Sequence, residues 1–222
     1  MLTGKIKQAL SLLSTPLIVD SMERLGVSSN HLDPDFKAIV PYSKMIGTAI
    51  TVELKQVTKK EQANLDLLSK AYETSYKLID PIIAISVPKS LAKFSIFGSV
   101  ASVRAQIRGF SGALIGGSVR DTQELQQSNF PIFSNSVSPG SITGKVSAVS
   151  TGKQIEIGGV KIEQGNILFG DNDGLIVIPE SNLSNIVDLA FEINTWEGEL
   201  KSFLTQGANY EQVIELIGKS PK

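Results

Sequence analysis

The hexapeptide GGSVRD, residues 116–121, ends an apolar run with a cation and an anion side by side. The run before it, ALIGG at 113–117, is typical of a buried strand that ends in glycines. Arg120 can bind a carboxylate through two parallel hydrogen bonds, and Asp121 can offer a hard oxygen ligand to Mg²⁺ or Mn²⁺. A 2-oxo acid bound to such a metal would therefore meet both groups that it needs.

The same two residues also have a purely structural interpretation. Aspartate is a common N-cap residue, so Asp121 can cap a helix predicted over 122–127, while Arg120 forms an ion pair. The local sequence by itself favours this structural interpretation. Only the surrounding elements can decide whether Arg120 and Asp121 face a ligand.

A second motif, GDNDGLIVIP at 170–179, contains two more aspartates. Asp-Gly before an alternating apolar run predicts a tight turn into a strand. A calcium-binding loop does not fit, because Gly174 comes too early and Asn182 occupies the place of the bidentate glutamate. We therefore predict a structural turn at this motif.

Composition narrows the class of protein. The chain has 222 residues, of which 41% are hydrophobic and 19% charged, so it can bury a sizeable core. A net charge of −1 without a long basic run argues against a nucleic-acid partner. The absence of cysteine and the single histidine, His31, exclude disulfides, thiolate metal sites and histidine metal clusters. No apolar segment reaches the roughly 18 residues of a membrane span, so we expect a soluble, cytoplasmic protein without a membrane partner.

The apolar spacing predicts strands that alternate with helices in the middle of the chain. The predicted strands are 46–57, 82–87, 113–117 and 131–134, and the predicted helices are 60–78, 97–108 and 122–127. This order favours a partly parallel sheet with helices on its faces. From Gly140 to about residue 180, short alternating runs between glycines predict antiparallel strands. We expect one domain over 1–222, with N-terminal helices in 1–30, an α/β core over 40–180 and C-terminal helices in 182–217.

Four segments, in this order, resemble the RraA-like family, which includes 4-hydroxy-4-methyl-2-oxoglutarate aldolases and the regulator of ribonuclease E activity. The segments are TPLIVDSMERLG, IGTAITV, GGSVRD with the following FPIF, and GDNDGLIVIP. The resemblance covers the chain from about residue 14 to 205. It implies an α/β fold, a β/β/α sandwich similar to the swivelling phosphohistidine domain with a mixed sheet and flanking helices. It also implies homotrimers or hexamers with sites between subunits.

The resemblance implies a class II, metal-dependent pyruvate aldolase or oxaloacetate decarboxylase that cleaves a C–C bond of a small 2-oxo acid. Arg120 matches the residue that holds pyruvate and neutralises its enolate, and Asp121 matches a ligand of Mg²⁺ or Mn²⁺. Glu124 is one candidate for the carboxylate that holds a basic water. Glu197 roughly matches a family glutamate that reaches a neighbouring subunit's site.

A helix start 22 residues before Asp121 completes the site that the resemblance implies. Its residues, whose backbone N–H groups would receive the pyruvate, are Gly98, Ser99, Val100 and Ala101. A helix N-terminus suits this role because its first N–H groups are free and partly positive. Many relatives carry an acid where this chain has Ser99, so an acidic neighbour of the metal is missing. The alternative is therefore a non-catalytic regulatory protein that binds a ribonuclease or another partner.

Overall fold

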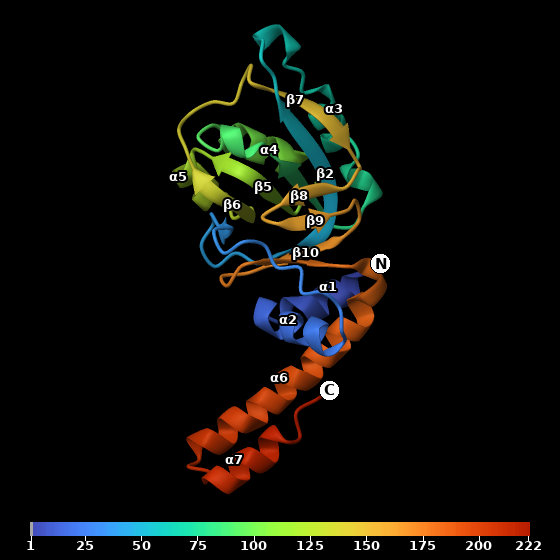
Figure 1. Ribbon diagram of the computed structural model, residues 1–222, viewed down its shortest axis with the longest axis vertical. Helices are drawn as coiled ribbons and strands as arrows, with labels where there is room; N and C mark the ends of the chain where they lie inside the picture. The colour runs from blue at the N-terminus through green and yellow to red at the C-terminus, as the bar shows by residue number, and fades with distance from the viewer. Residues whose placement is uncertain (1) are drawn as a thin grey trace.

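The computed structural model describes residues 2–222, and within them nine strands form one mixed sheet (Figure 1). The eleven strands in this range are β1 (Lys37–Ala38), β2 (Met45–Gln56), β3 (Pro81–Ser86), β4 (Ser95–Phe97), β5 (Gly112–Val119), β6 (Ile132–Val137), β7 (Val146–Thr151), β8 (Ile155–Ile157), β9 (Val160–Ile162), β10 (Ile167–Gly170) and β11 (Leu175–Ile178). The order in the sheet is β1-β6-β5-β3-β2-β10-β11, with β4 beside β5 and β7 beside β2. A separate hairpin pairs β8 with β9.

Helices flank this sheet and extend from it. They are α1 (Gly4–Ser11), α2 (Thr15–Arg24), α3 (Asp66–Tyr72), α4 (Ser99–Ile107), α5 (Thr122–Gln127), α6 (Leu183–Thr205) and α7 (Tyr210–Ile217). Strands β2, β3, β5 and β6 run parallel to one another, and β4 runs parallel to β5. Strands β1, β7, β10 and β11 pair antiparallel with their neighbours. The predicted mixed α/β architecture is therefore confirmed.

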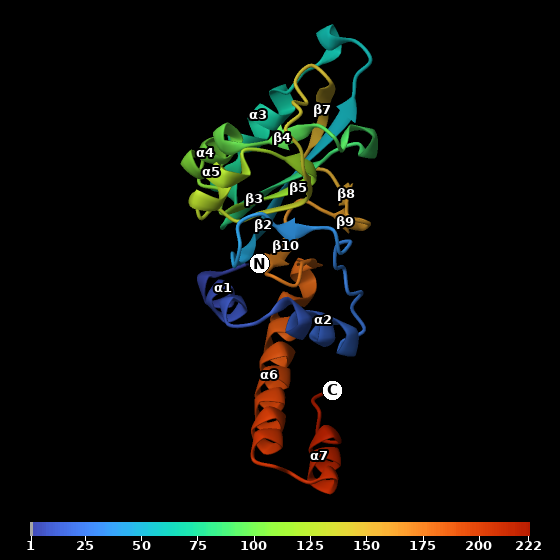
Figure 2. The ribbon, with the colours of Figure 1, turned by 90° about the vertical axis from the view of Figure 1, so that its left-hand side faces the viewer.

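Both faces of the sheet are buried, and β3 shows how the sequence achieves this. Ile83 and Ile85 belong to the core beneath α3, α4 and α5, while Ile82 and Ala84 belong to the core shared with the β8–β9 hairpin. Side chains alternate between faces along a strand, so a continuous apolar run fills both cores. Figure 2 shows the three helices on one side of the sheet and the hairpin on the other.

One short segment connects the two edges of the sheet. His31 forms an antiparallel bridge with Ile176 of β11, and six residues later Lys37 pairs with Ser134 of β6. The mixed sheet is therefore nearly closed. The finer likeness to the swivelling phosphohistidine domain stays a prediction.

The predicted helix over 60–78 is wrong in its extent. The chain forms a 3₁₀ turn at Lys60–Gln62, then α3, then a second 3₁₀ turn at Ser75–Lys77. Asn64 interrupts the helix because its side-chain oxygen accepts the Asp66 N–H at 2.7 Å and its carbonyl accepts the Ala148 N–H at 2.7 Å. The short strands β1 and β4 were not predicted, and the helix expected over 97–108 begins at Ser99.

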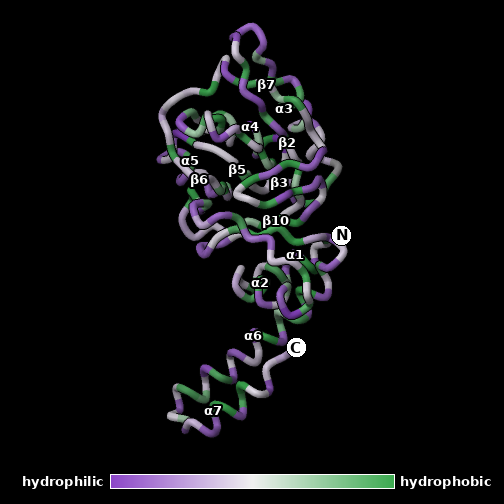
Figure 3. The backbone as a smooth tube through the Cα atoms, in the orientation of Figure 1, coloured by the Kyte–Doolittle hydropathy of each residue, from purple (hydrophilic) through white to green (hydrophobic). Residues whose placement is uncertain are grey.

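The C-terminal helices extend away from the sheet as an antiparallel pair (Figures 1 and 3). The first part of α6 packs on α2 beneath β10 and β11, in a core that includes Ile18, Ile186 and Ile193. Its later part holds α7 through a 2.8 Å hydrogen bond from Trp196 Nε1 to the Leu216 carbonyl. No helix in residues 2–222 combines the length and the apolar character needed to cross a membrane.

Candidate functional site

Two neighbouring parallel strands, β4 and β5, end at the same edge of the sheet. Ser95 pairs with Ser118 and Phe97 with Val119, so the residues that follow the two strands emerge together. The Arg120 N–H donates to the Phe97 carbonyl at 2.9 Å and fixes this register beyond the strands. Arg120 and Asp121 therefore lie beside the start of α4, although about twenty residues separate them in sequence. Ligand sites of α/β sheets form at such carboxyl edges.

Gly98 allows this close approach. A Cβ atom at this position would lie 2.5 Å from Asp121 Oδ2 and 3.1 Å from Arg120 Cγ. The backbone of Gly98 is extended, with φ −148°, so the requirement for glycine is spatial and not conformational. The Arg120–Asp121 pair thus lies directly against the turn that opens α4.

Asp121 precedes α5, but its side chain makes no capping hydrogen bond to that helix. Its Oδ2 instead accepts the Ser99 backbone N–H at 3.1 Å and the Ser99 hydroxyl at 3.3 Å. The residue adopts a left-handed conformation, with φ 57°, which is uncommon outside glycine but tolerated by aspartate. The capping interpretation of Asp121 is therefore wrong for α5, since the carboxylate faces the N-terminus of α4.

Arg120 is close to Asp121 without being neutralised in a tight pair. Its Nε lies 3.6 Å from Asp121 Oδ2, and the two side chains are 45% and 33% exposed. An ion pair of this length and exposure contributes little stability. The guanidinium therefore keeps N–H donors that can bind an anion.

A cavity of about 280 Å³ opens between α3, α4 and the ends of β4 and β5. Its charged lining residues are Arg104, Arg120 and Asp121, and its apolar wall includes Leu68 and Ile142. Three of the four predicted backbone-binding residues, Gly98, Val100 and Ala101, line it. Ser99 borders it through its hydrogen bonds to Asp121. The structure thus brings together the predicted helix start and the predicted Arg-Asp pair.

The first turn of α4 adds a second attraction for an anion. The first four N–H groups of a helix have no acceptor within the helix, and those of Val100 and Ala101 belong to this set. Both residues line the cavity. The partial positive charge of a helix N-terminus strengthens hydrogen bonds to a carboxylate.

Two residues of the cavity, Arg104 and Tyr72, were missed by the sequence analysis. The Arg104 guanidinium lies 4.5 Å from the centre of the Tyr72 ring, in a cation–π contact. Burial raises the pKa of Tyr72 to about 12, against a smaller lowering by the Arg104 charge. The ring therefore stays neutral at physiological pH. Arg104 stands four residues after Val100 and thus on the same helix face, a spacing that was visible in the sequence.

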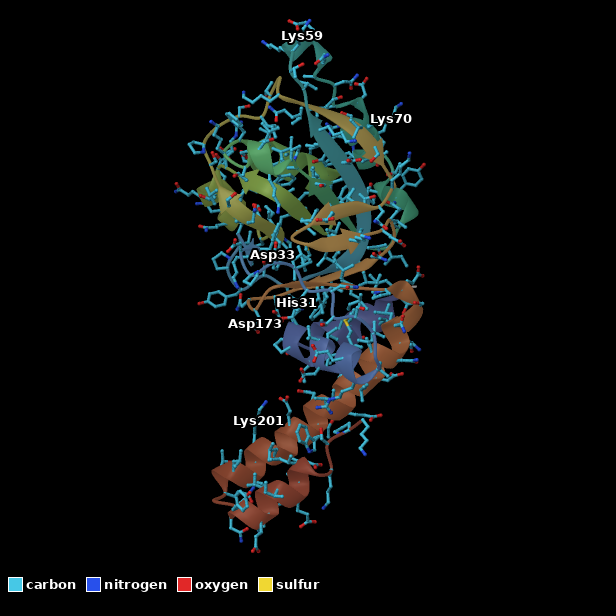
Figure 4. The ribbon with its side chains drawn as sticks, in the orientation of Figure 1. His31, Asp33, Lys59, Lys70, Asp173 and Lys201 are labelled. Atoms are coloured by element: carbon cyan, nitrogen blue, oxygen red, sulfur yellow. The ribbon has the colours of Figure 1, made fainter. Side chains whose placement is uncertain are left out.

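The two glutamates proposed as bases do not line the cavity within this chain. Glu124 is an exposed residue of α5. Glu197 pairs with Lys201 at 2.8 Å on the distal part of α6, where Figure 4 shows Lys201 far from the sheet. The role of Glu197 at a neighbouring subunit's site, and the expected trimer or hexamer, stay predictions.

The cavity can hold only a metal ion that takes few of its ligands from the protein. Asp121 is the single acidic residue among those lining the cavity, and residues 2–222 contain no group of three or more His, Asp or Glu that could hold an ion. Mg²⁺ commonly binds through one or two carboxylates and keeps water and substrate oxygens as its other ligands. Asp121 therefore fits Mg²⁺ or Mn²⁺ as one protein ligand among substrate and water.

The fold defines a mixed α/β protein whose candidate site lies at the carboxyl edge of parallel strands. The chain belongs to the RraA-like family, described as Aldolase/RraA, whose family model matches residues 15–177. The predicted family is thereby confirmed.

Individual relatives show how far this family reaches. Protein DlpA of Legionella pneumophila is 25% identical over 202 residues, but the match spans 89% of this chain and only 31% of that protein. A protein of Halalkalibacterium halodurans, whose name proposes a 4-hydroxy-4-methyl-2-oxoglutarate aldolase, is 28% identical over 80% of this chain and 78% of its own. The solved structure of Streptomyces coelicolor RraAS2, described as an unusual member of the RNase ES inhibitor RraA protein family, has a TM-score of 0.78 at 20% identity. It covers 90% of this chain and 97% of its own, and shows the same fold.

Proposed function

We propose that this protein is a metal-dependent lyase that cleaves a C–C bond of a small 2-oxo acid and releases pyruvate. The observation that carries this proposal is the shared cavity of Arg120, Asp121 and the first turn of α4. It joins a bidentate carboxylate binder, a hard oxygen ligand and free backbone N–H donors in one place. The relative named as a possible 4-hydroxy-4-methyl-2-oxoglutarate aldolase supports the same reaction class.

In this proposal, the chain's residues act on the pyruvate half of the substrate. The N–H groups of Val100 and Ala101 receive the carboxylate, and Arg120 lies beside the oxygens on which negative charge develops. When the C–C bond breaks, its electron pair passes to C3 of the pyruvate half and gives an enolate. Fixed positive charge at that point stabilises the transition state.

Asp121 would hold the divalent cation together with substrate and water oxygens. When bound, such a cation acts as a Lewis acid that polarises a carbonyl oxygen. In an aldol cleavage the substrate hydroxyl loses its proton as the bond breaks, whereas in decarboxylation carbon dioxide leaves. Both reactions end with protonation of C3, so one site serves either substrate.

The test is pyruvate release from oxaloacetate and from 4-hydroxy-4-methyl-2-oxoglutarate, with Mg²⁺ and with EDTA. Arg120→Ala should lower kcat/KM by about 10²–10³-fold, the usual effect of losing one transition-state donor. Arg108→Ala is the matched control, because Arg108 follows the end of α4, does not line the cavity and pairs with Glu73 at 3.0 Å. Activity that persists in EDTA, or in Arg120→Ala, would refute the proposal.

A second candidate function, a regulator that binds a ribonuclease or another protein, is supported by the exposed apolar side chains of α4. Val100, Val103 and Ile107 are 83%, 53% and 78% exposed there, an unusual display of apolar side chains. A folded protein that releases no pyruvate from either substrate, yet retains a purified ribonuclease in a pull-down, would favour this function. Turnover without retention would favour the lyase.

A further inference from the structure

Arg104 occupies the same cavity as Arg120 but at a distance from the helix start. It lies four residues beyond Val100, which places it about 6 Å further along the axis of α4 and on the same face. Leu68 and Ile142 line the wall of this cavity as well. The cavity thus offers one cation beside the helix start, a second cation further along, and apolar surface for a short carbon chain.

Arg104 has no acidic partner in the part of the chain that the structure describes. Its one side-chain hydrogen bond is long, 3.5 Å from Nη1 to Ser69 Oγ. Arg108, the residue that follows the last turn of α4, instead forms an ion pair with Glu73 at 3.0 Å. The arginine at the end of α4 is therefore paired with an acid, whereas Arg104 in the cavity keeps its charge available for a ligand.

The Arg104 guanidinium packs over the face of the Tyr72 ring. Tyr72 is 3% exposed and packs edge-on against Phe110, with ring centres 5.6 Å apart. A guanidinium stacked on a ring uses its face and leaves the N–H donors at its edge free for a carboxylate. The contact with the Tyr72 ring also restricts the conformations of the Arg104 side chain, which lowers the conformational entropy lost when a ligand binds.

The charge of the cavity favours an anionic ligand. Two arginines against one aspartate give a net charge of +1 among the lining residues. The carboxylate and oxo group of a 2-oxo acid would occupy Arg120 and the start of α4, which leaves Arg104 without a counter-charge. A second carboxylate at the other end of the substrate supplies one.

We propose that Arg104 is a specificity-determining residue that binds the distal carboxylate of a dicarboxylic 2-oxo acid. This inference rests on the proposed function for the orientation of the ligand in the cavity. It assigns the selection between substrates to a residue distinct from Arg120 and Asp121. The first carboxylate is bound at the helix start and the second by Arg104.

The test compares the binding of 2-oxoglutarate and 2-oxopentanoate, which have the same chain length and differ in the distal carboxylate. Calorimetry with Mg²⁺ present should give wild-type protein about 10–100-fold tighter binding of 2-oxoglutarate, the range of a charged hydrogen-bonded pair. Arg104→Gln should bring the ratio of the two dissociation constants close to one. Arg104→Lys keeps the charge without the planar fork and should retain part of the preference. Arg108→Gln, the matched control, should keep the full ratio.

The outcomes separate this inference from the proposed function, because binding needs no turnover. A wild-type ratio near one, an unchanged ratio in Arg104→Gln, or no binding of either acid by folded protein would overturn the role of Arg104. The expected ratios without pyruvate release would uphold Arg104 and overturn the lyase. Melting temperatures of the variants show whether each is folded, and Arg104→Lys remains informative if Arg104→Gln is not.

Discussion

Asp171 and Asp121 each stand just beyond a strand, β10 and β5, and each binds the first residue of a helix elsewhere in the chain. Asp171 accepts the Thr15 N–H at 2.8 Å and the Thr15 hydroxyl at 2.7 Å, and so caps α2. Asp121 accepts the Ser99 N–H at 3.1 Å and the Ser99 hydroxyl at 3.3 Å, at the start of α4. The two arrangements use the same groups, but the second is looser.

The difference lies in what surrounds each carboxylate. Both carboxylate oxygens of Asp171 accept hydrogen bonds: Oδ2 accepts the Thr15 N–H, and Oδ1 accepts the Thr15 hydroxyl and, at 3.0 Å, the Asp173 N–H. Its partner Thr15 is buried. All contacts found for Asp121 within residues 2–222 fall on Oδ2, and Arg120 stands beside it. Asp173 and His31 line one pocket where the sheet meets the N-terminal helices (Figure 4). We infer that saturated hydrogen bonding marks the structural aspartate, and unsaturated bonding marks the one that can serve a ligand.

The largest expected effect tests this contrast through stability. Asp171→Ala should lower the free energy of unfolding by about 3 kcal/mol, because it removes the cap of α2 and leaves buried donors without an acceptor. Asp121→Ala should lower it by about 1 kcal/mol or less, since its bonds are longer and more exposed. Urea unfolding of the two variants measures both values.

Asp171→Asn serves as the control, because the amide keeps one acceptor oxygen in the same place. It should lose less stability than Asp171→Ala. Equal losses in Asp171→Ala and Asp121→Ala would show that the tighter geometry at α2 carries no extra energy, and the distinction between the two aspartates would then fail.

Local signals in the sequence located the parts of the candidate site that follow strand ends. The Arg120–Asp121 pair was singled out because an apolar run, two glycines and a change to polar residues are visible within a few positions, whereas the binding role of Gly98 came from the resemblance to the RraA-like family. The turn at 170–174 was predicted for the same reason, and the Asp171 N–H donates to the Gly174 carbonyl at 3.0 Å. The fold class could be predicted because predicted strands and helices alternate along the middle of the chain.

The remaining features depend on contacts between distant segments. The bond from Thr15 to Asp171 joins residues 156 positions apart, and no local pattern announces it. Asn64 ends the overpredicted helix partly through Ala148, a partner in β7. Arg104 reads as an ordinary surface arginine until the packing of α3 places Tyr72 beneath it. The polar residues that follow a strand can thus be located from the sequence, whereas the contacts that another helix or strand makes with them cannot.

A smaller effect is expected from Gly98→Ala, which tests whether turnover depends on the position of Asp121 against the turn at Gly98. The added methyl group would lie 2.5 Å from Asp121 Oδ2, so Asp121 or the turn must move. A displacement of about 1 Å can cost about 10²-fold in rate, and we expect kcat/KM for pyruvate release to fall by roughly 10–100-fold. Gly198→Ala is the control, because in residues 2–222 no heavy atom outside its own stretch of α6 lies within 4 Å of its Cβ position. Full activity in Gly98→Ala would mean that the position of Asp121 does not matter for turnover.

The smallest effect concerns the Tyr72 ring, which packs against Arg104 in the cavity. Within the described part of the chain, the Asp171 site at the start of α2 has no such aromatic support. The pKa of Tyr72 is raised to about 12 in the folded protein, mainly by burial, against about 10 in an unfolded chain. As pH rises through 10, the unfolded chain loses the phenolic proton first, so the free energy of unfolding falls until pH 12. At pH 11 this contribution amounts to about 1 kcal/mol relative to pH 8.

Urea unfolding at pH 8 and pH 11 measures this contribution as the difference between wild type and Tyr72→Phe, which has no proton to lose. Tyr42→Phe is the matched control, since Tyr42 is 89% exposed and should leave the pH dependence unchanged. Arg104→Gln should steepen the loss, because the Arg104 charge lowers the pKa of Tyr72. An unchanged loss in Arg104→Gln would mean that the guanidinium does not lie over the ring in solution, and the support proposed for the distal carboxylate site would be absent.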